Sequence, residues 1–371
     1  MMTSSDFFER LSAQYAMRLP FAAYNKPNSV QLQVIFQNDT ELHHVNDYTE
    51  SGFAFSPFSK EKKVVLIPGK PLEAETDFDS KMPFFEENLS IIENDKEEHL
   101  TLVNQAIHTI EKGNLKKVVI SRKQEINTDE NPLQLFKRLL RTYPEAFTYI
   151  FFHPKVGLWL GATPEKLVQV DGLQFETMAL AGTQVAKEDQ DIIWDKKEID
   201  EQQFVVEDIE NKLQQLNLKN IKVHERNTLR TGNLLHLHSK ISGFMQRSKD
   251  DLKNLIETLH PTPAVCGLPQ DIALSFILEN ENYGREFYTG FLGELNIETE
   301  KHRSNHRRNV ENLAYRSVKR SSALYVNLRC LQYKAQEVVI YIGGGITRDS
   351  IAEREWEETV AKAQTMMRIL S

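Results

Sequence analysis

His260-Pro261-Thr262-Pro263-Ala264-Val265-Cys266-Gly267-Leu268-Pro269 is the segment of this 371-residue chain with the most restricted backbone geometry. We call residues 260–269 the signature loop. Each proline fixes its own φ near about −65° and pushes the preceding residue toward an extended conformation, so the segment can be neither a helix nor a central strand. Helix-like sequence flanks it on both sides. Taken alone, the residues predict a stiff, ordered loop between two helices.

Strand-like and helix-like segments follow one another outward from the signature loop. A helix is expected at about residues 97–112, before Gly113. Seven segments have the composition of strands: residues 30–36, 64–67, 118–121, 148–152, 158–160, 324–328 and 338–342. This mixture predicts an α+β fold. Segment 73–98 is acidic and interrupted by proline, so we expect it to cross the surface and to separate a strand-rich part, residues 1–96, from a second part, residues 97–371.

The overall composition is that of a soluble globular protein, with 40% hydrophobic and 26% charged residues. No apolar run approaches the ~20 residues that span a bilayer, and the N-terminus is too polar for a signal peptide, so we expect a cytoplasmic location. Cys266 and Cys330 are the only two cysteines, and both are expected to be reduced packing residues.

The charge balance disfavours nucleic acid and anionic membranes as partners. The chain has 53 acidic and 45 basic residues, which gives a formal net charge of −8. One basic run departs from this balance, at residues 301–308 with Arg316, Lys319 and Arg320. It has no interleaved aromatic residues, so we expect a solvated loop rather than a nucleic-acid site.

Two motifs place reactive side chains next to predicted strands. Lys117 precedes the β-branched run 118–120, where a lysine is usually solvated because burying an ammonium group is costly. Glu165 lies in the motif Gly-Ala-Thr-Pro-Glu at residues 161–165. Thr-Pro-Glu is also typical of a helix start, with an N-cap, a first-turn proline and a carboxylate near the positive end of the helix. Each motif is ambiguous on its own.

Carboxylates extend the apolar stripes of two predicted helices. Glu201 lies one turn before a stripe formed by Val205, Ile209, Leu213 and Leu216. In the C-terminal helix, Glu355, Glu358 and Lys362 lead along one side into Met366, Ile369 and Leu370. A carboxylate at a core-facing edge needs a compensating cation, and Mg²⁺ prefers oxygen ligands. For Glu358 and Lys362 the alternative is an exposed i,i+4 ion pair.

The signature loop and these motifs together resemble the chorismate-utilising enzymes, a family that includes the anthranilate, aminodeoxychorismate, salicylate and isochorismate synthases. Seven ordered motifs carry the resemblance over about residues 97–370, whereas residues 1–96 contribute little. The resemblance implies the fold of that family, two intertwined α/β subdomains with large antiparallel sheets flanked by helices. It also implies a monomer whose partner is the small-molecule substrate chorismate.

The resemblance assigns a role to each motif. Lys117 would be the general base toward water and Glu165 the general acid. Glu201 and Glu358 would bind Mg²⁺, with Glu355 as an outer-sphere helper. The other matching positions would contact the substrate: Ala181, Gly182, Thr183, His260, Ala264, Tyr288, Arg329, Gly343, Gly344, Gly345 and Lys362.

Three of these contacts can be described further. In the family, the residues matching Tyr288 and Arg329 bind the enolpyruvyl carboxylate, and the fork of an arginine pairs bidentately with such a group. Gly343, Gly344 and Gly345 follow a predicted strand, and their missing side chains would let backbone N–H groups approach an anion.

Ala264 bears on the reaction. Family members that form an aminated product or expel pyruvate usually have threonine here, whereas those that form isochorismate have His-Pro-Thr-Pro-Ala followed by an aliphatic residue. The resemblance therefore implies an isochorismate synthase, whose product would serve menaquinone or siderophore synthesis. The alternatives are a salicylate synthase or other chorismate lyase, and a noncatalytic chorismate-binding protein. Gln202 and Gln184 depart from the histidine and arginine that are common in the family.

Overall fold

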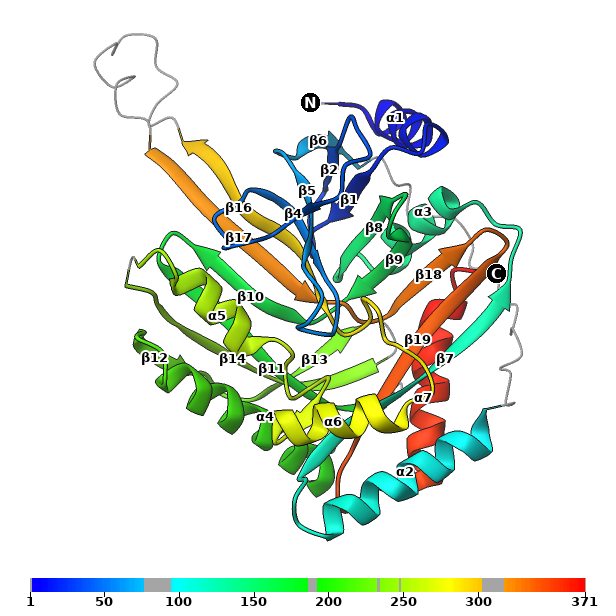
Figure 1. Cartoon of the computed structure of the whole chain (residues 1–371), viewed down its shortest axis with the longest axis vertical. Helices are drawn as coiled ribbons and strands as arrows, with labels where there is room; N and C mark the ends of the chain where they lie inside the picture. Colours follow the sequence, from blue (N-terminus) through cyan, green and yellow to red (C-terminus); the bar gives the residue numbers. More distant parts are fainter. Residues whose placement is uncertain are drawn as a thin grey trace.

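The computed structural model describes residues 2–76, 95–185, 192–231, 234–246, 248–301 and 317–370. Two antiparallel sheets form its centre, and helices lie around them (Figure 1). Sheet A runs in the order β15 (Gly267–Leu268), β7 (Lys117–Asn127), β19 (Glu337–Ile346), β18 (Cys330–Lys334), β9 (Gly157–Thr163), β8 (Phe147–His153), β1 (Phe21–Asn25), β2 (Gln31–Phe36) and β6 (Leu72–Glu75).

Sheet B contains the remaining described strands. Its order is β12 (Lys219–Val223), β14 (Leu234–Phe244), β11 (Gln174–Val185), β10 (Lys166–Asp171), β17 (Ser317–Val326), β16 (Phe291–Lys301), β4 (Gly52–Ser56), β5 (Val65–Pro68) and β3 (His43–His44), and β13 (Asn227–Thr231) also pairs with β14. Strands from the first 96 residues enter both sheets, because β1 pairs with β8 and β4 pairs with β16. The two parts of the chain are therefore intertwined.

Aromatic side chains fill the space between the two sheets. The ring of Phe147 in sheet A stacks on Tyr325 in sheet B with centroids 4.2 Å apart. The ring centroids of Phe151 in sheet A and Phe55 in sheet B are 4.5 Å apart. Strands β1, β4 and β8 are buried on both faces, which explains why their sequences are almost continuously apolar instead of alternating. The packed aromatic layer gives the pocket described below a rigid frame.

Helices cover the outer faces of the sheets. Sheet A packs against α1 (Ser4–Ala16), α3 (Pro132–Thr142) and α7 (Ala352–Met367), and sheet B against α4 (Lys196–Gln214) and α5 (Asp251–Leu259). The other two described helices, α2 (Lys96–Glu111) and α6 (Gln270–Asn280), pack beside β7. No helix among the described residues is long and apolar enough to cross a membrane.

Most elements agree with the sequence-based predictions. The α+β class and the large antiparallel sheets flanked by helices are confirmed, and so is the helix expected at 97–112, which is α2. The signature loop connects α5 with α6 as predicted, contains β15, and has cis peptide bonds before Pro261 and Pro269. Both cysteines are buried and free.

One alternative is excluded, one local prediction needs correction, and other predictions fall outside the described residues. No helix starts at Thr163-Pro164-Glu165, because β9 ends at Thr163 and β10 begins at Lys166 in an antiparallel sheet. Residues 73–75 do not cross the surface as a loop but pair with β2 as part of β6. Residues 77–94 and most of the basic run, 302–316, lie outside the described residues, and the boundary at residues 96 and 97 stays a prediction.

Candidate active site

A pocket lies where both sheets, two helices and the signature loop meet. Strands β7 and β19 of sheet A and β11 and β14 of sheet B contribute side chains, as do α4 and α7. Of the residues predicted as functional, twelve line it: Glu165, Ala181, Gly182, Thr183, Glu201, Ala264, Tyr288, Arg329, Gly343, Gly345, Glu358 and Lys362. Its lining combines apolar side chains with a few converging polar groups, as is usual for a site that binds a small organic ligand.

Lys117 is fully buried at the start of β7, directly behind the pocket wall. Its Nζ lies 2.9 Å from Oε1 of Glu201, which projects from α4. Burial opposes ionisation of Glu201, but the positive charges of Lys117 and two further lysines outweigh it and lower the pKa of Glu201. Gly345 on β19 makes this contact possible, since a Cβ there would lie 2.5 Å from Glu201 Oε1 and 3.2 Å from Lys117 Cε. The predicted base and the predicted metal ligand therefore form one buried ion pair.

Glu165 lies in the connection between β9 and β10, with its side chain buried at the pocket. Thr262 of the signature loop donates a hydrogen bond to its Oε1 at 3.2 Å. Burial raises the pKa of Glu165 to about 7, although Thr262 and the charge of Lys117 act in the opposite direction. A carboxyl group with this pKa is partly protonated at neutral pH and can donate a proton.

Arg329 and His236 form another polar part of the pocket wall. Nη2 of Arg329 lies 2.7 Å from Nε2 of His236 on β14. Since a guanidinium only donates, Nε2 accepts, and Nδ1 carries the hydrogen toward the Gly182 carbonyl at 3.2 Å. Burial, Arg329 and Lys362 lower the pKa of His236 well below its usual range, so the ring is neutral. Burial also lowers the pKa of Arg329, to about 10.

His236 was not predicted from the sequence. In the run Leu234-Leu235-His236-Leu237-His238 the two histidines read as polar positions of an amphipathic strand. The strand lies next to a bulge in β11 between Ala181 and Thr183, where the register shifts at Gly182. That bulge turns the predicted loop 181–183 toward His236 and the pocket.

Tyr288 closes the pocket beside the glycines of β19. Its ring stacks on Tyr341 with centroids 5.5 Å apart. A Cβ on Gly343 would lie 2.7 Å from the Tyr288 hydroxyl, so the glycine is needed for the tyrosine to occupy this place. Gly343 also accepts a hydrogen bond from Lys362 Nζ through its carbonyl at 2.9 Å. These glycines therefore leave room for charged side chains, as well as backbone groups, to approach β19 closely.

Each of the three carboxylates predicted to bind magnesium is paired with a lysine. Besides the Lys117–Glu201 pair, Glu358 lies 2.7 Å from Lys362, and Glu355 lies 2.6 Å from Lys197 on α4. Lys197 is a second residue that the sequence reasoning missed. Burial and the neighbouring Glu358 raise the pKa of Glu355, and Lys197 opposes this. The lysines compensate the negative charge on the two facing helices.

The chemistry of these residues fits a hard divalent cation. They offer carboxylate oxygens, two of them from residues that line the pocket, Glu201 and Glu358. The carboxylates do not all lie within 4.8 Å of one another, and within the described residues the triplet that does so is a different group, Asp39, Glu41 and His43. To bind an ion, Glu201 and Glu358 would therefore have to give up their contacts with lysines.

Four predicted residues do not line the pocket. Lys117 and Glu355 lie behind it, each in contact with a residue of α4. Gly344 faces Glu355, whose Oε2 would be 3.9 Å from a Cβ there. His260 borders a different cavity on the far side of the signature loop. Its ring packs edge-on against Phe291, and burial lowers its pKa to about 3.

Comparison with known proteins identifies the family. Residues 32–301 match one profile described as chorismate binding enzyme, and residues 313–368 match a second with the same description. The chain therefore belongs to the chorismate binding enzyme family.

Curated relatives include enzymes with two different names. The isochorismate synthase DhbC of Bacillus subtilis is 28% identical over 293 residues, which cover 74% of this chain and 68% of that protein. The isochorismate synthase MenF of Escherichia coli is 29% identical over 74% of this chain and 61% of its own length. Anthranilate synthase component 1 of Aquifex aeolicus is 26% identical over 74% of this chain. The match spans 53% of the last protein, about half its length.

Solved structures support the fold. The menaquinone-specific isochorismate synthase MenF from Escherichia coli superposes with a TM-score of 0.75 at 22% identity, covering 95% of this chain and 89% of that one. A protein from Bacillus anthracis, titled a putative 2,3-dihydroxybenzoate-specific isochorismate synthase, also gives a TM-score of 0.75, covering 98% and 99%. The fold predicted from the sequence motifs is therefore confirmed.

Proposed function

We propose that this protein is an isochorismate synthase, an isomerase that adds water to C2 of chorismate and removes the C4 hydroxyl group. The observation that carries the proposal is the arrangement of Lys117 and Glu165. Lys117 is fully buried behind the pocket wall, and Glu165 is a buried carboxyl group at the same pocket with a pKa near 7. A basic group directly behind the pocket wall and an acidic group at the pocket suit a reaction that removes one proton and delivers another.

Each group would perform one part of the exchange. Lys117 would take a proton from water as the oxygen attacks C2. Glu165 would protonate the C4 hydroxyl group, which leaves as water. The atoms added and lost are the same, so the product has the mass of the substrate. General acid and general base catalysis each contribute about 10² to 10⁴ in rate.

The other polar groups would hold the two carboxylates of chorismate. Arg329, fixed by His236, and Tyr288 would bind the enolpyruvyl carboxylate. Arginine suits this task because its planar fork matches a carboxylate. Lys362 would contact the ring carboxylate from α7. The anionic substrate therefore would find its positive charges locally, although the whole chain is acidic.

We propose Mg²⁺ as the cofactor, held by Glu201 and Glu358 with Glu355 in support. When bound, the ion would neutralise these acids and bind a substrate carboxylate, as Mg²⁺ commonly does with one or two protein carboxylates. The lysines that now pair with the acids would have to move. A monomer in the cytoplasm stays our expectation for the molecule as a whole.

The test is incubation of purified protein with chorismate and MgCl₂, with and without EDTA and ammonium, followed by chromatography and mass spectrometry. We expect a product of unchanged mass that forms reversibly and disappears with EDTA. Pyruvate with salicylate would instead indicate a lyase. Ammonium-dependent anthranilate would favour the reaction named for the Aquifex relative. Binding without conversion would indicate a noncatalytic chorismate-binding protein.

A further inference from the structure

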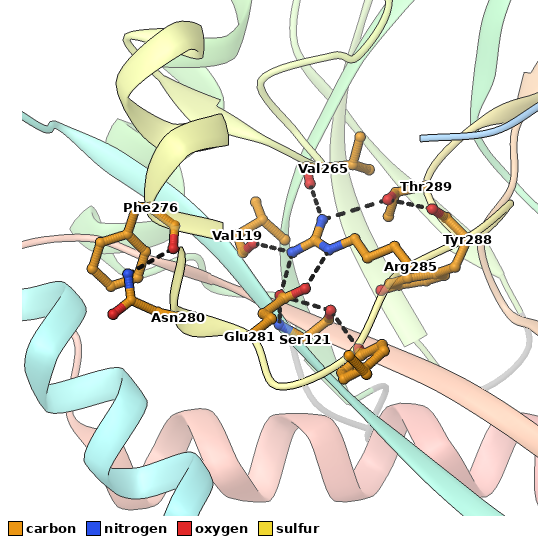
Figure 2. A network of polar contacts seen from close by, with 10 residues as sticks. Val119, Ser121, Val265, Phe276, Asn280, Glu281, Arg285, Tyr288 and Thr289 are labelled. Atoms are coloured by element: carbon orange, nitrogen blue, oxygen red, sulfur yellow. Dashed lines mark hydrogen bonds and ion pairs between the residues drawn. The ribbon is translucent and has the colours of Figure 1, made fainter. Parts of the chain in front are cut away.

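A second buried ion pair lies beside the pocket, between α6 and β16, and contains no residue assigned above. Nη2 of Arg285 is 2.5 Å from Oε1 of Glu281, and its Nε is 2.8 Å from Oε2, so the contact is bidentate (Figure 2). Both side chains are 2% exposed. Burying a pair of charges away from water costs free energy, so the pair calls for an explanation.

The pair completes the edge of β7. Strand β15 pairs with β7 only at Lys117 and Val118, and the last backbone bond there runs from Val119 N to Cys266 O. Beyond this point Arg285 Nη2 donates to the Val119 carbonyl at 2.6 Å. Glu281 Oε1 accepts from the backbone N–H of Ser121 at 2.7 Å. The two side chains therefore supply the bonds that a longer β15 would have made.

The same guanidinium group also binds two loops of the pocket. Its Nη1 donates to the Val265 carbonyl of the signature loop at 3.0 Å and to Thr289 Oγ1 at 3.4 Å (Figure 2). Thr289 directly follows Tyr288. Val119, Val265 and Tyr288 all line the pocket. One side chain thus links the strand that carries Lys117, the loop that carries Ala264 and the loop that carries Tyr288.

We propose that Arg285 and Glu281 are positioning residues, which hold these three walls in the register that the reaction needs. The inference rests on the proposed function. Arginine is required because its rigid fork reaches acceptors on four different residues, whereas lysine is a single point charge. Stability alone does not call for the pair, since replacing a buried ion pair by apolar residues of similar volume is often neutral or stabilising. What apolar residues cannot replace is the set of directed bonds.

The experiment compares kcat, KM for chorismate and the melting temperature of the wild-type protein and four variants. Arg285→Lys and Glu281→Gln change the pair conservatively. The double variant Arg285→Met with Glu281→Leu replaces it by apolar side chains. Arg320→Lys is the control, because Arg320 forms an exposed pair with Glu298 at 2.9 Å on strands β17 and β16.

We expect Arg285→Lys and Glu281→Gln to lower kcat about 10- to 100-fold, since small displacements of reacting groups cost about that much. The double variant leaves no charge unpaired but removes the partners of the Val119 and Val265 carbonyls and of the Ser121 N–H, so it should melt several degrees below the wild type and also show the loss in kcat. Arg320→Lys should change neither quantity.

A double variant with wild-type kcat would overturn the inference and reduce the pair to a structural contact. So would Arg285→Lys with an unchanged kcat, a result that remains informative if the double variant does not fold. Failure of the proposed function is recognised separately, because the wild-type protein itself would then give no isochorismate. If the wild type forms another product from chorismate, the same comparison of kcat values tests the positioning role on that reaction.

Discussion

The pocket and the Arg285–Glu281 pair are both buried and charged, but they differ in how completely their polar atoms are bonded. Arg285 donates through all three of its nitrogens, and Glu281 accepts through both oxygens. Glu165, in contrast, has a hydrogen bond from Thr262 to one oxygen and faces the cavity. The saturated network fixes a geometry, whereas the incompletely bonded groups keep capacity for a ligand.

The effect on ionisation follows the same division. Burial by itself would lower the pKa of Arg285, but Glu281 outweighs it and raises that pKa, so the arginine stays charged at any pH of interest. For Glu165 burial dominates, and its pKa rises to about 7. Completing the hydrogen bonds of a buried group thus stabilises one charge state, while leaving them incomplete brings a pKa into the range useful for catalysis.

Lys117→Ala is expected to have the largest effect on turnover. We expect turnover of chorismate to fall by about 10³-fold or more, because the variant loses the group that would activate water. Binding of chorismate, measured by calorimetry, should change little, since Lys117 does not line the pocket. Lys116→Ala, at the neighbouring exposed position, is the matched control. A Lys117→Ala variant with near-normal turnover would remove this residue from the mechanism.

Glu165→Gln should have the next largest effect. The amide keeps the shape of the carboxyl group but cannot donate the proton, so we expect kcat to fall about 10²- to 10³-fold. In the wild type, kcat/KM should decline as the pH rises through about 7, where Glu165 of the free enzyme loses its proton. Thr262→Val, which removes a hydrogen bond that lowers this pKa, should move the decline to higher pH. A decline at the same pH in Thr262→Val would mean that another group controls it.

The same substitution should change the pH dependence of stability. The folded-state pKa of Glu165 is about 7, above its ordinary value of 4.5. Between these values the folded protein binds more protons than the unfolded chain, so stability is present at low pH and is lost as pH rises through about 7. Glu165→Gln lacks this loss, on the order of 3 kcal/mol.

Urea denaturation of both proteins at pH 5 and pH 8 measures the effect. The difference in unfolding free energy, variant minus wild type, should increase from pH 5 to pH 8, while the contributions of shared groups cancel. A difference that is constant with pH would show that Glu165 has an ordinary pKa in the folded protein.

The sequence alone predicted the residues at the pocket better than the contacts that hold them in place. Lys117, Glu165 and Glu201 belong to short motifs whose residue types have restricted uses, so they could be named individually. That Lys117 contacts Glu201 could not be predicted, because the contact joins a strand and a helix that are separated by 84 positions and depends on the small size of Gly345. Local sequence carries no such information.

The residues that hold the site in place could not be predicted from the sequence for the same reason. Glu281 and Arg285 read as an ordinary i,i+4 pair, and their side chains find open backbone groups on β7 because β15 begins only at Gly267. The segments predicted as strands include neither β1 nor β4, and the insertion of these two into different sheets depends on pairing with β8 and β16, which are distant in the chain.

The smallest expected effect concerns His236, a neutral side chain in the pocket wall that holds the charged Arg329. His236→Asn removes an acceptor that helps to hold Arg329. Losing a hydrogen bond to a charged group costs about 1.5 kcal/mol, so the dissociation constant for chorismate should rise about 10-fold. Because His236 does not take part in proton transfer, kcat should change little.

His238→Asn is the control, since His238 lies two residues further along β14, bonds Asn227 and does not line the pocket. The pKa of His236 is far below its usual range, so its charge does not change between pH 6 and pH 8. The weakening in His236→Asn should therefore be the same at both pH values. A deficit that appears only at one pH, or a large fall in kcat, would place His236 with Glu165 among the groups that exchange protons. Its role would then no longer resemble that of the Arg285–Glu281 pair, which acts by holding other residues in place.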